Sequence, residues 1–314
     1  PSLWNVMIRF PFTKRTFASS YLIWRMEETQ FAHDSNIRAQ GVGESTAWEA
    51  IYHAAQEEPY FHAHEQSAYG DASADQVDEV RALLAKDGTS RWWSTPMDRG
   101  HQRRVIFRRD ETGRAPGDPS PDLRKWMHKT CTGGAEGEWW TMPIGADILT
   151  TSRSMTTAPA VALVGNEDEF GDKEALVFEA PRIGEDVRVY EVASVADWVA
   201  LVDGTPAEVT RSRRTTWGRF DETARWFIPD WAELARSYDA IHLTVDAYLD
   251  LSAYPVPCAG GYTLLAGWGP DQSLWLTQPH IEWADPRVAV RFGQARWEYL
   301  TEGAPSDGSR VSIL

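Results

Sequence analysis

Residues 264–277, LLAGWGPDQSLWLT, read as two apolar strands joined by a tight turn. The residues before Gly269 and after Gln272 are apolar enough to predict two central strands of a sheet, with Asp271 and Gln272 in the turn between them. We therefore expect the turn at one end of a sheet, where ligand sites on mixed sheets tend to be built, with Asp271 at the mouth of the main cleft. The alternative is that Asp271, which follows Gly269 and Pro270, only closes the turn.

Further strands and helices are expected upstream of this stretch. Residues 174–180 (EALVFEA) and 187–192 (VRVYEV) flank a Pro/Gly turn and predict two adjacent strands. Residues 239–245 (DAIHLTV) predict a strand that carries His242 on its polar face. Short helices are expected after Ser194 and Asp230, both typical N-cap residues, and residues 158–165 also favour a helix.

The first part of the chain has the pattern of helices. Residues 16–35, 44–59 and 73–88 have apolar stripes, and the last segment has a capping box and a terminal Gly88. We expect an α+β fold: a helical N-terminal domain over residues 1–90, followed by a mixed β-sheet domain over residues 91–314.

Composition narrows the function classes. The chain has 314 residues, with 31 basic and 46 acidic side chains and a formal charge of -15, so it is expected to repel free duplex nucleic acid. Its two cysteines form no pairing or zinc pattern, which favours a reducing, cytoplasmic setting. With no apolar run of membrane length and no leader pattern at the start, we expect a soluble protein without a membrane partner. Sixteen tryptophans indicate a heavily aromatic core or large flat contacts.

No phosphate-binding, dinucleotide, hydrolase or zinc-protease motif occurs. Three segments nevertheless follow one another in an order that resembles the ADP-ribosyltransferases. They are residues 105–113 (VIFRRDETG), residues 148–163 (ILTTSRSMTTAPAVAL) and the turn at Asp271 and Gln272. These enzymes use an arginine on an early strand, a hydroxyl-bearing strand followed by a helix, and a glutamate near a late strand. Separately, residues 175–276 look similar in part to uncharacterised actinobacterial and phage-borne proteins, a resemblance that names no activity.

The resemblance implies ADP-ribosyl transfer or NAD hydrolysis, with NAD as substrate and a protein as a possible acceptor. Arg108 would grip the pyrophosphate, Thr150 or Ser152 would hold the nicotinamide ribose, and Asp271 would stabilise the cation formed as nicotinamide leaves. His242 and Trp268 would line the cofactor site. Gln272 cannot supply the negative charge, so Asp271 or Glu282 must do so, or transfer is absent. Arg108 also lies among other arginines, a pattern typical of solvated surface.

Two other classes of function stay open. One is a non-catalytic binding or assembly protein that uses its tryptophans as a contact surface; one form of this hypothesis is a phage-associated protein. The other is a metal or haem enzyme centred on histidines, because His62, His64, His53 and Glu65 lie close together in sequence. Pro59 interrupts that segment and the spacing fits no familiar metal site, so we interpret this group as structural.

Overall fold

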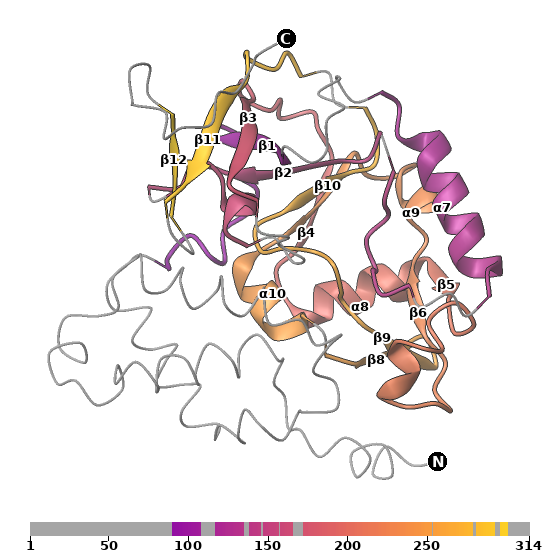
Figure 1. The fold of residues 1–314 in the computed structure, drawn as a ribbon. Coiled ribbons are helices and arrows are strands. Elements are labelled where there is room, and N and C mark those ends of the chain that lie inside the picture. The colour runs from indigo at the N-terminus through magenta and orange to yellow at the C-terminus, as the bar shows by residue number, and fades with distance from the viewer. Residues whose placement is uncertain are drawn as a thin grey trace, which may run out of the picture.

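An eight-stranded sheet lies at the centre of the structure (Figure 1). The computed structural model describes residues 90–107, 117–134, 138–145, 147–156, 158–165, 172–252, 254–278, 281–292 and 296–300. The strand order is β12-β11-β3-β1-β2-β10-β7-β4. The strands are β1 (Gln102–Phe107), β2 (Leu149–Arg153), β3 (Glu174–Glu179), β4 (Val189–Val192), β7 (Ala240–Leu243), β10 (Ser273–Trp275), β11 (Arg287–Arg291) and β12 (Trp297–Tyr299).

All neighbouring strands in this sheet are antiparallel except β4 and β7, which run parallel. A parallel pair needs a long crossover, and here the connection contains α8 (Val195–Gly204), α9 (Trp231–Leu234) and the two-stranded ribbon of β5 (Pro206–Glu208) and β6 (Phe227–Pro229). A sheet of mixed direction accompanied by helices confirms the predicted α+β class.

The remaining elements of the described residues are two helices and a two-stranded ribbon in the half of the molecule that carries α8 and α9 (Figure 1), and two 3-10 turns. They are α7 (Ser120–Thr132), α10 (Val245–Leu251), the ribbon of β8 (Val256–Cys258) and β9 (Gly261–Thr263), and two 3-10 turns, η1 (Val161–Leu163) and η2 (Trp217–Arg219). Of the helices in the described residues, none is long and apolar enough to cross a membrane.

The helix starts predicted from capping residues are confirmed. Ser194 begins α8 and its hydroxyl accepts a hydrogen bond from the backbone N–H of Asp197. Asp230 begins α9 in the same way, accepting from Ala232 and Glu233. Residues 158–165, in contrast, form only the single turn η1.

The predicted hairpin over residues 264–277 is wrong. The second half does form a central strand, β10, between β2 and β7. The first half does not pair with it, because residues 264–272 cross the molecule as a buried connection from β9. Gly267 has a φ of 73°, and a Cβ there would lie 1.8 Å from the ring of Trp140, so only glycine fits this close crossing. Local apolar content predicted burial correctly but could not distinguish a strand from a buried loop.

The predicted adjacency of residues 174–180 and 187–192 is also wrong. These segments form β3 and β4, which are separated in the sheet by β1, β2, β10 and β7. β3 pairs with β1 and β11, and β4 is an edge strand. The turn between the two segments carries the chain to the other end of the sheet instead of reversing it.

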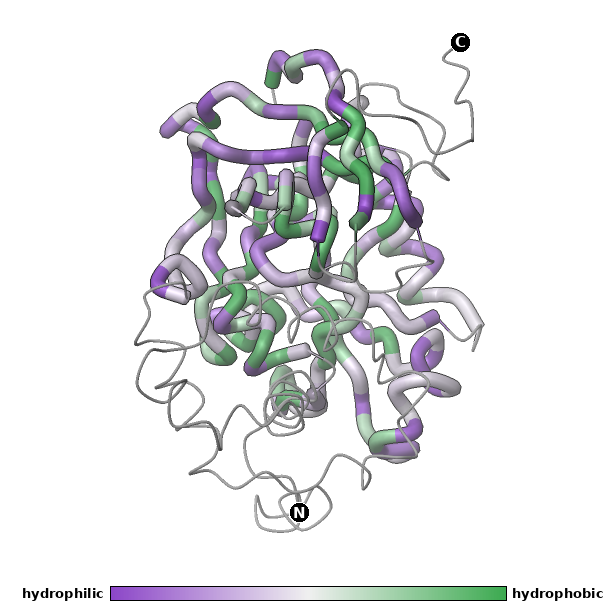
Figure 2. Tube along the Cα trace, turned by 60° about the vertical axis from the view of Figure 1, so that its left-hand side comes forward, coloured by the Kyte–Doolittle hydropathy of each residue, from purple (hydrophilic) through white to green (hydrophobic). Residues whose placement is uncertain are grey.

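Nine tryptophans of the described residues are buried, which favours the aromatic core over the contact surface. They are Trp93, Trp139, Trp198, Trp217, Trp226, Trp231, Trp268, Trp275 and Trp297. Trp198, Trp231 and Trp268 pack edge-on or tilted at ring distances of 5.7 to 6.3 Å, a geometry that aromatic pairs prefer. The hydrophobic segments accordingly lie mostly along the strands and the helices beside them (Figure 2).

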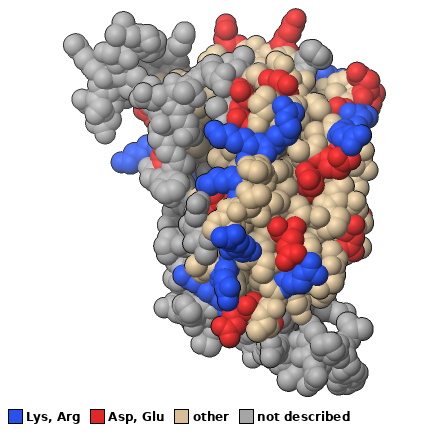
Figure 3. Space-filling model, turned by 90° about the vertical axis from the view of Figure 1, so that its right-hand side faces the viewer, with Lys and Arg blue, Asp and Glu red and all other residues tan. Residues whose placement is uncertain are grey.

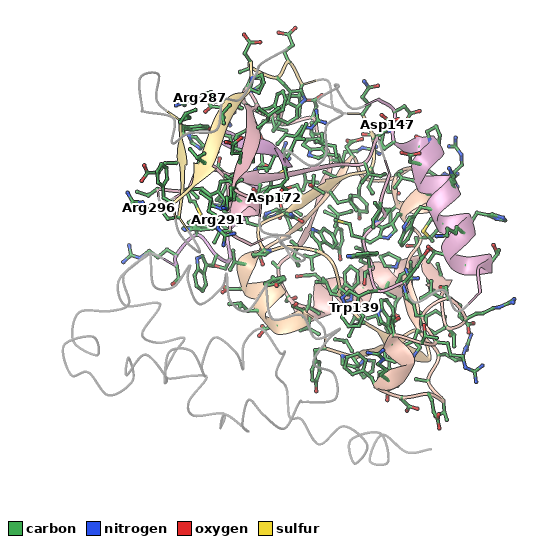
Figure 4. All side chains as sticks on the ribbon, in the orientation of Figure 1. Trp139, Asp147, Asp172, Arg287, Arg291 and Arg296 are labelled. Atoms are coloured by element: carbon green, nitrogen blue, oxygen red, sulfur yellow. The ribbon has the colours of Figure 1, made fainter. Side chains whose placement is uncertain are left out.

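The two ends of the sheet differ in character. Arg287, Arg291 and Arg296 lie on the β11–β12 end, while Trp139 lies in the helix-covered half (Figure 4). Arg287 stacks on Tyr299 at 3.5 Å and lies 3.8 Å from Glu179, so the charges of this end are paired locally. The cluster of Trp198, Trp231 and Trp268 lies in the other half, whereas Trp297 of β12 packs against Phe107 of β1.

Candidate functional site

A row of polar side chains crosses one face of the sheet from β2 to β4. The register pairs Ser273 of β10 with Thr151 of β2 and with His242 of β7, and pairs His242 with Glu191 of β4. Residues directly opposite each other share a face, and so do residues two apart on a strand. His242, Glu191 and Arg153 therefore lie on the same face.

Asp271 is bound to Arg153 at the start of this row. The residue is only 1% exposed and has a φ of 55°, a left-handed conformation that aspartate tolerates in turns. One carboxylate oxygen accepts the backbone N–H of Arg153 at 2.8 Å and the other accepts its guanidinium Nε at 2.7 Å. The side chain of Asp271 thus takes the place of a backbone ladder partner where β10 turns away from β2.

His242 joins this pair to a second carboxylate. Its Nε2 lies 3.3 Å from Asp271 and its Nδ1 lies 2.5 Å from Glu191, and the ring itself is fully buried. Both ring nitrogens can donate only when the imidazole is protonated. The positions of the two carboxylates therefore favour an imidazolium cation.

Two opposing effects determine the pKa of His242. Burial opposes the charged form, but hydrogen bonds to Asp271 and Glu191 outweigh it and raise the pKa above its usual value. With His242 protonated, the two cations Arg153 and His242 balance the two anions Asp271 and Glu191. A buried group of charges is tolerated when it is neutral and fully hydrogen-bonded, as this one is.

Residues 92–97 cover the network. The guanidinium of Arg153 lies 4.6 Å from the ring of Trp92 and donates to the Thr95 hydroxyl at 3.1 Å and to the Pro96 carbonyl at 3.0 Å. The backbone N–H of Met97 donates to Glu191 at 3.1 Å. These bonds use the remaining polar atoms of the Arg153 and Glu191 side chains, so the four charged residues join β2, β7, β4, the turn before β10 and this segment into one unit.

Of the expected site residues, the structure brings together Asp271 and His242 but not the hydroxyl residues. Ser152 is paired with Arg103 on the face opposite Arg153, and its hydroxyl accepts the backbone N–H of Ala162 at 2.9 Å, where it holds η1. Thr150, two residues earlier, lies on that opposite face too. Ser152 and Thr150 therefore lie on the face of the sheet opposite the Arg153 side chain that binds Asp271.

The aromatic and amide residues of the expected site are engaged inside the protein. Trp268 is fully buried against Trp198 and Trp231, so its ring is part of the core. The Gln272 side chain accepts the backbone N–H of Gly269 at 3.1 Å and stays within its own turn. Glu282 is exposed.

Several expected residues lie outside the described part of the chain. Arg108 is one of them, and the arginine that contacts Asp271 among the described residues is Arg153. Others are His53, His62, His64 and Glu65, together with residues 1–89 of the predicted helical domain. Within the ranges that the structure describes, no group of three or more His, Cys, Asp and Glu side chains could hold a metal ion.

Sequence reasoning missed Arg153 and Glu191. A signal existed, because each is a charged residue inside a segment that otherwise reads as a strand, LTTSR and VYEV. Charged residues at such positions need a partner if both faces of the sheet are covered. The partners come from strands distant in sequence, so the pairing itself could not be predicted.

Comparison of the chain with protein-family models, curated proteins and solved structures gives no match.

Proposed function

We propose that this chain is a nucleotide-binding protein with the strand arrangement of an ADP-ribosyltransferase, in which Asp271 stabilises the fold instead of catalysing transfer. The observation that carries the proposal is the engagement of Asp271: 1% exposed, with both oxygens bound to Arg153. A catalytic carboxylate must face the cation that forms as nicotinamide leaves. A carboxylate already neutralised by a buried guanidinium contributes little to that step.

The nucleotide part of the proposal draws on the arrangement of three strands. β1, β2 and β10 are neighbours in the sheet, so the strand that precedes Arg108, the strand that carries Thr150 and Ser152, and the strand that follows the Asp271 turn lie side by side. Such an arrangement is compatible with a ligand lying across the ends of these strands.

The same adjacency favours a second candidate, ADP-ribosyl transfer or NAD hydrolysis. In that reading Asp271 would supply the catalytic charge, and Arg153 would hold it in position. The two candidates differ in whether the chain releases nicotinamide from NAD.

The test is nicotinamide release by the wild type, Asp271→Asn and Gln272→Glu proteins, with NAD binding measured by calorimetry and folding checked by circular dichroism. We expect the wild type to bind NAD without turnover. The Gln272 side chain accepts a hydrogen bond from the backbone N–H of Gly269, and a glutamate at this position can accept the same bond. Nicotinamide release gained only in Gln272→Glu would fit a wild-type protein that binds NAD without transferring ADP-ribose. Wild-type turnover that is lost in Asp271→Asn would establish the second candidate and overturn the first. Absence of NAD binding would overturn both.

A further inference from the structure

A pocket of about 570 Å³ opens beside β5 and β6, away from the buried network. Its size falls within the range of small-molecule sites. The side of the molecule that carries α7 is shown in Figure 3, with Lys and Arg side chains among acidic ones. The residues that line the pocket are Cys131, Glu208, Thr210, Arg211, Arg214, Gly218, Glu222, Thr223, Ala224, Arg225 and Trp226.

The pocket is basic within an acidic chain. It has three arginines against two glutamates, whereas the whole chain has a formal charge of -15. One arginine is already paired, since Arg225 lies 2.7 Å from Glu208. Arg211 and Arg214 are exposed, and no ion pair or hydrogen bond of either side chain is found among the described residues. Two guanidinium groups are therefore available to a ligand.

A rigid turn presents these arginines. Between them lies Arg213, whose side chain is fully buried and donates to the Trp140 carbonyl at 2.6 Å and to Glu138 at 3.1 Å. Thr216 adds a hydroxyl bond to the Glu138 carbonyl at 2.8 Å. Because the turn is fixed from the inside, Arg211 and Arg214 are held at the pocket with little loss of backbone freedom on binding.

Uncharged side chains such as Thr210 and Trp226 also line the pocket. The Thr210 hydroxyl lies 2.9 Å from Glu208. Trp226 is 1% exposed, and its indole N–H is buried without a hydrogen-bond partner in the described residues. The contacts that the pocket offers to a charged ligand are therefore its exposed arginines.

We propose that this pocket binds the phosphate groups of a nucleotide-sized anion. Guanidinium forks match phosphate oxygens in a bidentate manner and hold their charge at all relevant pH values. The nucleotide portion of this inference rests on the proposed function, whereas the phosphate portion follows from the pocket alone. The ligand class is a diphosphate ester, with Arg211 and Arg214 as its charged contacts.

The test is calorimetric titration of the full chain with inorganic pyrophosphate, ADP and NAD, using wild type, the double variant Arg211→Gln/Arg214→Gln and the control Arg236→Gln. Arg236 is an exposed arginine, but it is paired with Glu233 and does not line the pocket. We expect the double variant to lose pyrophosphate and ADP affinity by on the order of 10-fold or more, because each charge-assisted bond contributes at least that much. The control should bind as the wild type does. Glu222→Gln, which removes an acidic group from the pocket, should tighten binding.

The outcomes separate this inference from the proposed function. Pyrophosphate binding that depends on Arg211 and Arg214, without NAD binding, would keep the pocket and overturn the proposed function. NAD binding that is equal in the double variant and the control would keep the function and overturn the pocket. Absence of pyrophosphate and ADP binding by the wild type would also overturn the pocket.

Discussion

Two charged clusters of the described residues differ in their electrostatic environment: the buried cluster of Arg153, Asp271, His242 and Glu191, and the pocket cluster of Arg211 and Arg214 beside β5 and β6. Arg153 is buried and each of its polar groups has a protein partner, including Asp271 at 2.7 Å. Arg211 and Arg214 are exposed and keep their donors for solvent or a ligand. Burial of a charge is costly unless it is paired, whereas an exposed charge needs no partner.

The difference separates stability from binding. The buried cluster joins β2, β10, β7 and β4, so changes there should act on folding. The pocket cluster lies on a turn that Arg213 holds from within, so changes at its exposed arginines should act on affinity alone. Substitutions in the two clusters test this contrast.

The largest effect is expected for Asp271→Ala. It leaves Arg153 and the protonated His242 buried without their shared anion, which should lower the free energy of unfolding by about 3 to 5 kcal/mol. Urea denaturation measures the change. The matched control is Glu233→Ala, which removes an exposed ion pair with Arg236 and should cost less than about 1 kcal/mol. Equal losses in the two variants would contradict the structural role of Asp271.

His242→Gln should cost less at pH 6, about 2 to 3 kcal/mol, because glutamine still donates to one of the two carboxylates. The variant should also change the pH dependence. The folded pKa of His242 is raised above its unfolded value, so its contribution is fully present below about pH 6.5 and is lost as the pH rises through the folded pKa. Unfolding curves from pH 6 to pH 9 should show wild-type stability falling with pH. An equally steep decline in His242→Gln would assign the pH dependence to other groups.

Glu191→Gln should have a smaller effect, about 1 kcal/mol, because the Glu191 side chain is 28% exposed and an amide oxygen can still accept the N–H of Met97. Loss of the Glu191 carboxylate removes one of the two anions that favour the protonated His242. The decline of stability with pH should therefore begin at a lower pH than in the wild type. Nuclear magnetic resonance titration of the His242 ring would measure the shift directly, and an unchanged His242 pKa would contradict this coupling.

The smallest effect on stability is expected for Arg214→Gln. An exposed side chain with no ion pair among the described residues should change the free energy of unfolding by less than about 0.5 kcal/mol. Thermal and urea unfolding measure this directly. A loss comparable to that of Asp271→Ala would show that the pocket arginines also stabilise the fold.

Several of the local elements could be predicted from the sequence. The start of α8 at Ser194 and the start of α9 at Asp230 follow from side-chain hydrogen bonds to nearby N–H groups, which are encoded within a few residues. The candidate site was predicted only in part. His242 and Asp271 were identified as polar residues in unusual places, but Arg153 was not identified as their partner, because the two residues of that pair lie 118 positions apart.

What the sequence by itself determined is therefore the kind of structure at several places: strands, capped helices and a buried aromatic interior. Only the tertiary structure decided which strands are neighbours. Residues 264–272 are apolar enough for a strand, yet they cross the molecule as a loop, since Trp268 packs against two tryptophans from helices α8 and α9. The strand order then decided that Asp271 meets Arg153 and that Ser152 faces the other side. Strand pairing and side-chain alternation act between segments far apart in the chain, so no local pattern contains them.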